Sequence, residues 1–157
     1  MTTNEQRQHT WDSYFLDIAN AVRQKSKDTS TKCGVVIVGQ DKQIVSTGFN
    51  GFPRGIDETD PKRWERPVKY QFVEHAERNA IYNAARSGVS LCGCTLYLFG
   101  FGPPTVPCTE CVKAVIQSGI VRVVGRAYKI ASGTWATNLP FACALLGEAG
   151  VEFVELE

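Results

Sequence analysis

His75-Ala76-Glu77 and Pro107-Cys108-Thr109-Glu110-Cys111 are the two segments that decide the fold and the chemistry expected of this chain. Cys108 and Cys111 are three residues apart, so at the start of a helix both sulfur atoms lie on one face and can bind the same ion. His75 supplies a third ligand. Three protein ligands leave the fourth tetrahedral position of a zinc ion open, which is the arrangement of a catalytic site.

The residues around these ligands fit the same prediction. Pro107 suits the entry of a helix, because its fixed φ matches the first turn and its missing N–H is not needed there. The order H-x-E followed by P-C-x-x-C is typical of zinc-dependent cytosine and adenine deaminases. Glu77 is therefore expected to take a proton from the water that attacks C4 of a cytosine ring, and to pass it to N3 and then to the departing ammonia.

Two simpler interpretations explain less of the pattern. A lone C-x-x-C is often a structural zinc knuckle or a redox pair, and a lone H-x-E arises by chance in many helices. A redox pair, however, requires neither His75 nor Glu77. A closed structural site needs a fourth ligand, and the other histidine, His9, lies near the poorly constrained N-terminus.

Composition predicts one compact domain, residues 1–157, with 43% hydrophobic residues. The formal net charge of +1 counts against a nucleic-acid partner. No segment resembles a signal peptide or a membrane span, so we expect a cytoplasmic protein without a membrane partner. The four cysteines outside the zinc motif are expected to be small core residues, with a second zinc left open for the first three: Cys33, Cys92, Cys94 and Cys143.

Apolar periodicity predicts an α/β fold in which a five-stranded mixed sheet is covered by helices. Helices are expected at 11–22, 76–86, 108–118 and 138–150, and strands at 33–39, 44–49, 95–99, 121–125 and 152–156. The first two strands form an antiparallel hairpin. The last two are parallel because a helix lies between them. Ala76, Ala80 and Ala84 form a small-residue stripe that permits close helix packing.

Three segments resemble the deoxycytidylate deaminases: Ser46-Thr47-Gly48-Phe49-Asn50-Gly51-Phe52-Pro53-Arg54-Gly55, His75-Ala76-Glu77-Arg78-Asn79-Ala80-Ile81 and Pro107-Cys108-Thr109-Glu110-Cys111. The resemblance implies the three-layer cytidine-deaminase-like fold, Zn²⁺ as cofactor, and conversion of dCMP to dUMP with release of ammonia. It also implies a homo-oligomer, often a hexamer, with activation by dCTP and inhibition by dTTP.

By position, Asn50 matches the family asparagine that hydrogen-bonds the substrate, although Asn-Gly also favours a plain tight turn. Ala76 and Pro107, inside the two motifs, are counted as substrate-binding residues with it. Arg54 is the preferred phosphate ligand. The charged stretch 56–74 is expected to be a solvated loop, with a phosphate clamp as the alternative. Trp135 is placed in a loop, where it either stacks on the base or packs onto the core.

Two other functions stay open at this point. The same chemistry can act on another cytosine nucleoside or nucleotide, or on adenosine in tRNA, although the near-neutral charge weakens the tRNA hypothesis. A zinc-stabilised binding subunit without turnover is the alternative from a different class, and the intact Glu77 speaks against it.

Overall fold

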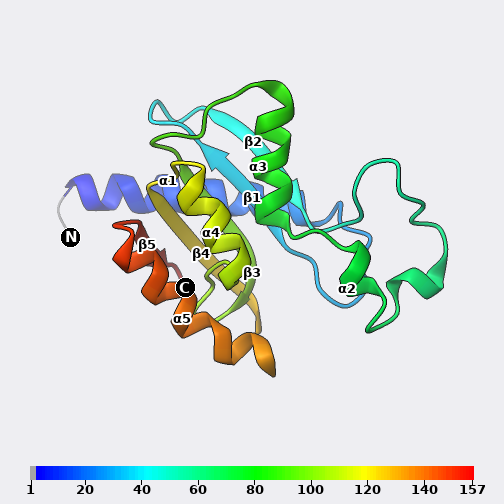
Figure 1. The fold of residues 1–157 in the computed structure, drawn as a ribbon. Helices are drawn as coiled ribbons and strands as arrows, with labels where there is room; N and C mark the ends of the chain where they lie inside the picture. Colours follow the sequence, from blue (N-terminus) through cyan, green and yellow to red (C-terminus); the bar gives the residue numbers. More distant parts are fainter. Residues whose placement is uncertain (1–2) are drawn as a thin grey trace.

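The computed structural model describes residues 3–157, and the side chains of residues 3–5 and 7–9, including that of His9, lie outside this description. Its centre is a five-stranded sheet with the order β2-β1-β3-β4-β5 (Figure 1). The strands are β1 (Gly34–Val38), β2 (Ile44–Phe49), β3 (Thr95–Gly102), β4 (Arg122–Ile130) and β5 (Glu152–Glu155). β1 is antiparallel to both β2 and β3, whereas β3, β4 and β5 are parallel to one another. The predicted mixed sheet with parallel final strands is confirmed.

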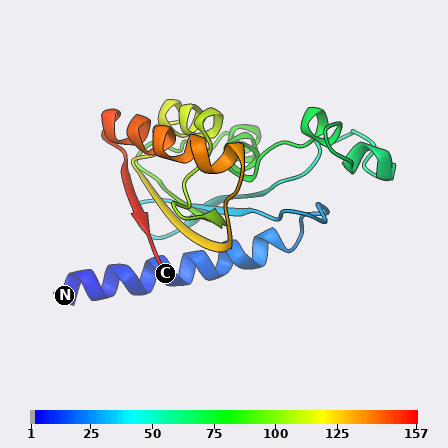
Figure 2. The ribbon, with the colours of Figure 1, turned by 90° about the horizontal axis from the view of Figure 1, so that it is seen from below.

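Helices cover both faces of the sheet and give three layers (Figure 2). α1 (Thr3–Arg23) lies on one face, where Phe15 and Leu16 pack against β1 and β3. The other face carries α3 (Ala76–Ser87), α4 (Thr109–Gln117) and α5 (Thr134–Glu148). The predicted stripe of Ala76, Ala80 and Ala84 is fully buried in the core between α3 and the sheet.

Two glycines let the helix entries approach the sheet closely. A Cβ on Gly48 of β2 would overlap the Ala76 carbonyl at the start of α3. A Cβ on Gly125 of β4 would overlap the Thr105 carbonyl in the segment that leads into α4. Because glycine has no side chain, the backbone can approach closely at these two points. This close approach fixes where both ligand-bearing helices begin.

An extended excursion separates β2 from α3 and reaches away from the body of the protein (Figure 1). It contains the 3₁₀ helix η1 (Pro61–Trp64) and the short helix α2 (Lys69–Phe72). Phe52 stacks on Trp64 at 4.3 Å and on Phe72 at 5.1 Å between ring centroids. Most residues of the stretch 56–74 are exposed, as expected of a solvated loop, but Trp64 and Phe72 pack on Phe52 and form a small aromatic cluster that no sequence period indicates.

The C-terminal half also differs from the prediction. β4 continues to Ile130, and α5 begins at Thr134 instead of residue 138, with Pro140 inside the helix. Pro140 is tolerated because both it and Ala136, whose carbonyl loses its helical partner, are exposed, so water can bind that carbonyl. Among residues 3–157, no helix is long and apolar enough to cross a membrane.

Candidate active site

The ligands predicted for zinc meet where two helices begin. His75 is the N-cap residue of α3, Cys108 is the N-cap residue of α4, and Cys111 lies in the first turn of α4. The Nδ1 atom of His75 is 3.4 Å from the Sγ atom of each cysteine. A tetrahedral ion with Zn–N of about 2.0 Å and Zn–S of about 2.3 Å holds such atoms about 3.5 Å apart, so the three residues fit zinc.

The protonation state of Cys108 supports the same fit. Hydrogen bonds with Cys111 and then with His75 outweigh burial and lower the pKa of Cys108 to about 4. A thiolate is the form that binds a metal. In the described part of the chain, His75, Cys108 and Cys111 are the one set of at least three His, Cys, Asp or Glu side chains that converges in this way.

Glu77 lies in the first turn of α3, two residues after His75. Its side chain is buried, with 6% of the residue exposed, and burial raises the pKa of its carboxyl group. A carboxylate with a raised pKa gives up and accepts protons more evenly near neutral pH, which suits general acid–base catalysis.

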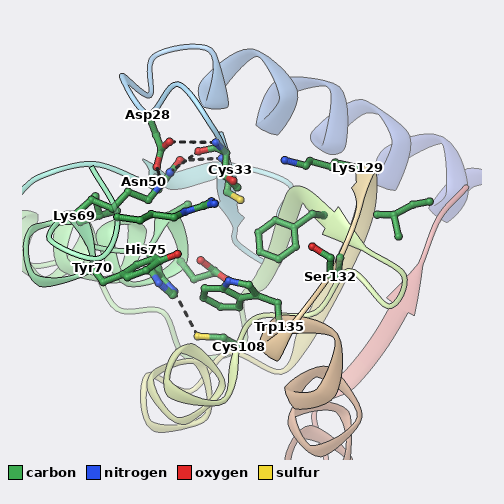
Figure 3. A pocket seen from close by; sticks show the side chains of 18 residues that line it. Asp28, Cys33, Asn50, Lys69, Tyr70, His75, Cys108, Lys129, Ser132 and Trp135 are labelled. Atoms are coloured by element: carbon green, nitrogen blue, oxygen red, sulfur yellow. Dashed lines mark hydrogen bonds and ion pairs between the residues drawn. The ribbon is translucent and has the colours of Figure 1, made fainter. Parts of the chain in front are cut away.

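These residues close one end of a cavity of about 360 Å³ (Figure 3). His75, Glu77 and Cys108 line that end, and the aromatic side chains of Phe101 and Trp135 line a wall beside them. The cavity therefore has room for a planar ring beside Glu77, His75 and Cys108.

Comparison with known proteins identifies the family. The model of the "cytidine and deoxycytidylate deaminase zinc-binding region" matches residues 9–127. Human deoxycytidylate deaminase is 37% identical over 149 residues, which cover 91% of this chain and 78% of that protein. An uncharacterized deaminase of Aliivibrio fischeri is 35% identical over 90% of each chain. The chain belongs to the cytidine and deoxycytidylate deaminase family.

Solved structures share the fold of this deaminase. The dCMP deaminase of the cyanophage S-TIM5, in complex with dCMP and dUMP, superposes with a TM-score of 0.72 at 24% identity and covers 99% of both chains. A diaminohydroxyphosphoribosylaminopyrimidine deaminase/5-amino-6-(5-phosphoribosylamino)uracil reductase of Thermotoga maritima is 23% identical and reaches a TM-score of 0.66 over 94% of this chain and 37% of that chain. The chain thus has the cytidine-deaminase-like fold.

Asn50 lies in the cavity of the deaminase with both ends of its amide engaged. Its Oδ1 accepts from the Cys33 N–H at 2.8 Å, and its Nδ2 donates to the Thr31 carbonyl at 2.8 Å. It therefore fixes the segment that enters β1. Ala76 also lines the cavity, whereas Pro107 is buried directly before Cys108 and is not among the described lining residues.

Three cationic side chains gather around Ser30 at the other end of the cavity. Lys69 is buried, and its Nζ donates to Asp28 Oδ2 at 2.9 Å and to Ser30 Oγ at 2.8 Å. Arg66 Nη2 is 3.4 Å from the same Oγ, and Lys129 Nζ is 3.3 Å from the Ser30 carbonyl. Figure 3 shows Lys69 and Lys129 pointing into the cavity that holds His75.

The structure does not bring Arg54 to this cavity. Its guanidinium donates to Asn83 Oδ1 at 2.6 Å in a separate hollow that also includes Tyr82 and Arg86. Sequence reasoning placed Arg66 and Lys69 in a stretch of balanced charge but did not single them out. It missed Lys129 and Asp28. The only indication that these residues belong to a site is that each is an isolated charge near an apolar strand.

The other cysteines take different positions. Cys33 is buried and lines the cavity, where burial raises the pKa of its thiol and keeps it neutral. Cys94 is buried and Cys143 is half-buried, as expected of core residues. Cys92 is exposed, so its assignment to the core was wrong, because it lies in the turn before β3 and not in the strand.

Proposed function

We propose that this chain converts dCMP and water to dUMP and ammonia. One observation carries the proposal: a single cavity runs from Glu77 and the His-Cys-Cys set at one end to three cationic side chains at the other. A nucleoside monophosphate has the same polarity, with its base at one end and its phosphate at the other. Relatives from human and from a phage are named deoxycytidylate deaminases, which supports this substrate.

The chemistry at the base end follows from the residues present. Zinc held by His75, Cys108 and Cys111 would lower the pKa of a water molecule and so supply the nucleophile. Glu77 is placed to accept a proton from the attacking water as the water oxygen bonds to C4, and to deliver that proton to N3. Glu77 then carries the second water proton to the amino group, which leaves as ammonia while the C4 carbonyl of dUMP forms.

The charge at the other end matches a phosphate monoester. Arg66, Lys69 and Lys129 carry three positive charges, and Asp28 is the one acidic residue that lines the cavity beside them. The remaining excess of two charges equals that of a dianionic phosphate, and charge-assisted hydrogen bonds to phosphate are strong. We therefore assign the phosphate to these side chains and keep Arg54 as the competing assignment.

The test is an ammonia-release screen over dCMP, CMP, deoxycytidine, cytosine and adenosine-containing RNA. The proposal expects the highest kcat/KM for dCMP. A preference for deoxycytidine over dCMP would show that the cationic end does not bind phosphate. Metal analysis accompanies the screen: the wild type should hold about one zinc per chain, and Cys108→Ser should lose most of it.

The resemblance also motivates proposals about assembly and control. We propose a single-domain, cytoplasmic homo-oligomer, with the hexamer as the expected form, that responds to dCTP and dTTP. The six unpaired cysteines of the structure suit a reducing compartment. Sedimentation of the purified protein tests the oligomer, and dCMP turnover with added dCTP or dTTP tests the response.

A further inference from the structure

Trp135 departs from the packing that its position on α5 predicts. Leu139, Ala142 and Leu146 form the buried stripe of this helix and belong to the core beside the sheet. Trp135 is one turn earlier, at i−4 from Leu139, and so continues the same stripe. It is nevertheless half-buried, because the stripe at this point runs past the core and over the cavity.

The contacts of Trp135 join it to the reacting end of the cavity. Its ring centroid lies 5.5 Å from that of His75, with the planes tilted by 46°. It also lies 5.5 Å from the Phe101 ring in an edge-to-face arrangement at 81°. Within residues 3–157, the indole Nε1 makes no hydrogen bond to another described group. Figure 3 shows the indole projecting into the cavity next to His75.

We propose that Trp135 contacts the base of the substrate and is a specificity-determining residue of the deaminase. The reaction requires C4 of the base to reach the position between Glu77 and His75. A ring in contact with His75 must then flank the base that occupies this position. Phe101 packs edge-to-face against the indole, so the indole presents a fixed surface to a planar ring.

Packing of an aromatic ring on a base gives a measurable expectation. Trp135→Ala should lower kcat/KM for dCMP by roughly tenfold to a hundredfold, whereas Trp135→Phe should keep most of it, since base–aromatic stacking tolerates a change of ring. Zinc content should be unchanged in both variants, because Trp135 supplies no ligand. A Trp135→Ala enzyme that binds zinc normally and stays within about twofold of the wild type would overturn the proposal.

Fluorescence tests the contact without relying on turnover. The chain has three tryptophans, and the other two, Trp11 and Trp64, do not line the cavity. Titration with dUMP should change the emission of the wild type, Trp11→Phe and Trp64→Phe proteins but not that of Trp135→Phe. This comparison holds even if Trp135→Ala fails to fold. An emission change that survives in Trp135→Phe would exclude the contact.

The inference rests on the proposed function for the identity of the base, and the experiment separates the two. The titration is repeated with deoxyuridine, which keeps the base and lacks the phosphate. Equal binding of dUMP and deoxyuridine, with the Trp135 signal present, would remove the phosphate assignment and leave the base contact supported. Binding of dUMP without a Trp135 signal would remove the base contact and leave the phosphate assignment standing.

Discussion

Two ion pairs of this protein each join a buried aspartate to a cationic side chain but lie in different regions. Under α1, Arg122 donates to both carboxylate oxygens of Asp12 at 2.8 and 2.9 Å, and Tyr97 Oη donates to Asp12 at 2.9 Å. Arg122 Nε donates to Glu152 at 2.7 Å. At the cavity, Lys69 donates to Asp28 and to Ser30 Oγ, which leaves one of its three ammonium protons for another acceptor.

The difference between the two pairs is whether the cation still has capacity for a ligand. In the first pair, the guanidinium binds both Asp12 and Glu152 between α1 and the sheet. In the second pair, Lys69 lines a cavity together with Arg66 and Lys129, and the acidic members of the described lining are Asp28 and Glu77. The carboxylates therefore occupy the cation in one region, whereas in the other region the cation can still bind an anion.

The largest expected effect separates the cavity from the rest of the fold. Glu77→Gln should lower kcat for dCMP roughly a hundredfold or more, because it removes the proton shuttle and keeps the shape. Stability should not fall, since burial opposes the charged form of Glu77. Turnover by ammonia release and thermal unfolding measure the two quantities. Near-normal turnover would refute the catalytic role and revive the interpretation as a binding subunit.

The second prediction breaks the pair under α1. Arg122→Met should reduce the free energy of unfolding by about 3–5 kcal/mol, because Asp12 loses its bidentate partner while buried. The kcat per folded chain should stay unchanged. Lys113→Met is the matched control, since its pair with Glu110 is exposed and is worth about 0–1 kcal/mol. Urea unfolding checks both, and equal effects of the two variants would contradict the comparison.

The third prediction breaks the pair at the cavity. Lys69→Met should reduce the preference for dCMP over deoxycytidine about tenfold or more, since a hydrogen bond to a charged group is worth about 1.5–3 kcal/mol. The ratio of the two kcat/KM values is unaffected by any loss of folded protein. Arg54→Ala should leave the ratio unchanged. The reverse result, with the ratio lost only in Arg54→Ala, would assign the phosphate to Arg54.

The smallest effect concerns pH. Burial raises the pKa of Asp28, but hydrogen bonds from Lys69, Ser30 and Thr31 outweigh it, so the net pKa is lowered. A pKa that is lower in the folded state stabilises the fold above the unfolded value of about 3.9 and ceases to do so as pH falls through the folded value. Asp28→Asn should thus be less stable than the wild type by on the order of 1 kcal/mol at pH 7.

That stability difference should shrink as the pH is lowered from 5 toward 2, as measured by urea unfolding at each pH. Asp17→Asn serves as the control, because the Asp17 side chain is 75% exposed and lies 3.6 Å from Arg126. A difference between Asp28→Asn and the wild type that stays constant over this range would show that Asp28 is not held in its charged form by these contacts.

Local patterns predicted most of the fold. The two cysteines predicted as metal ligands could be grouped for the same reason: spacing along a helix fixes which side chains share a face. Cys108 and Cys111 are neighbours in any helix, and the stripe of Ala76, Ala80 and Ala84 follows from the same geometry. The start of α5 was predicted too late because a proline usually marks the first turn of a helix. In the folded chain, Pro140 is exposed and lies inside the helix, which begins at Thr134.

The phosphate end could not be predicted in this way. Asp28, Lys69 and Lys129 come from a loop, a short helix and a strand that meet only in the folded chain. No spacing connects them. Trp135 was visible as a residue of interest, but its neighbour His75 is 60 positions earlier, so only the tertiary structure distinguishes a ring over the cavity from a ring on the core.

The two glycines under the helix entries have a consequence for how mutations in this protein would present themselves. A methyl group at Gly48 displaces the start of α3 and moves His75 away from Cys108. A methyl group at Gly125 displaces the start of α4 and moves Cys108 away from His75. Such a variant would bind zinc more weakly, although none of its ligands had been changed. In an activity assay, it would need more free zinc in the buffer for the same turnover.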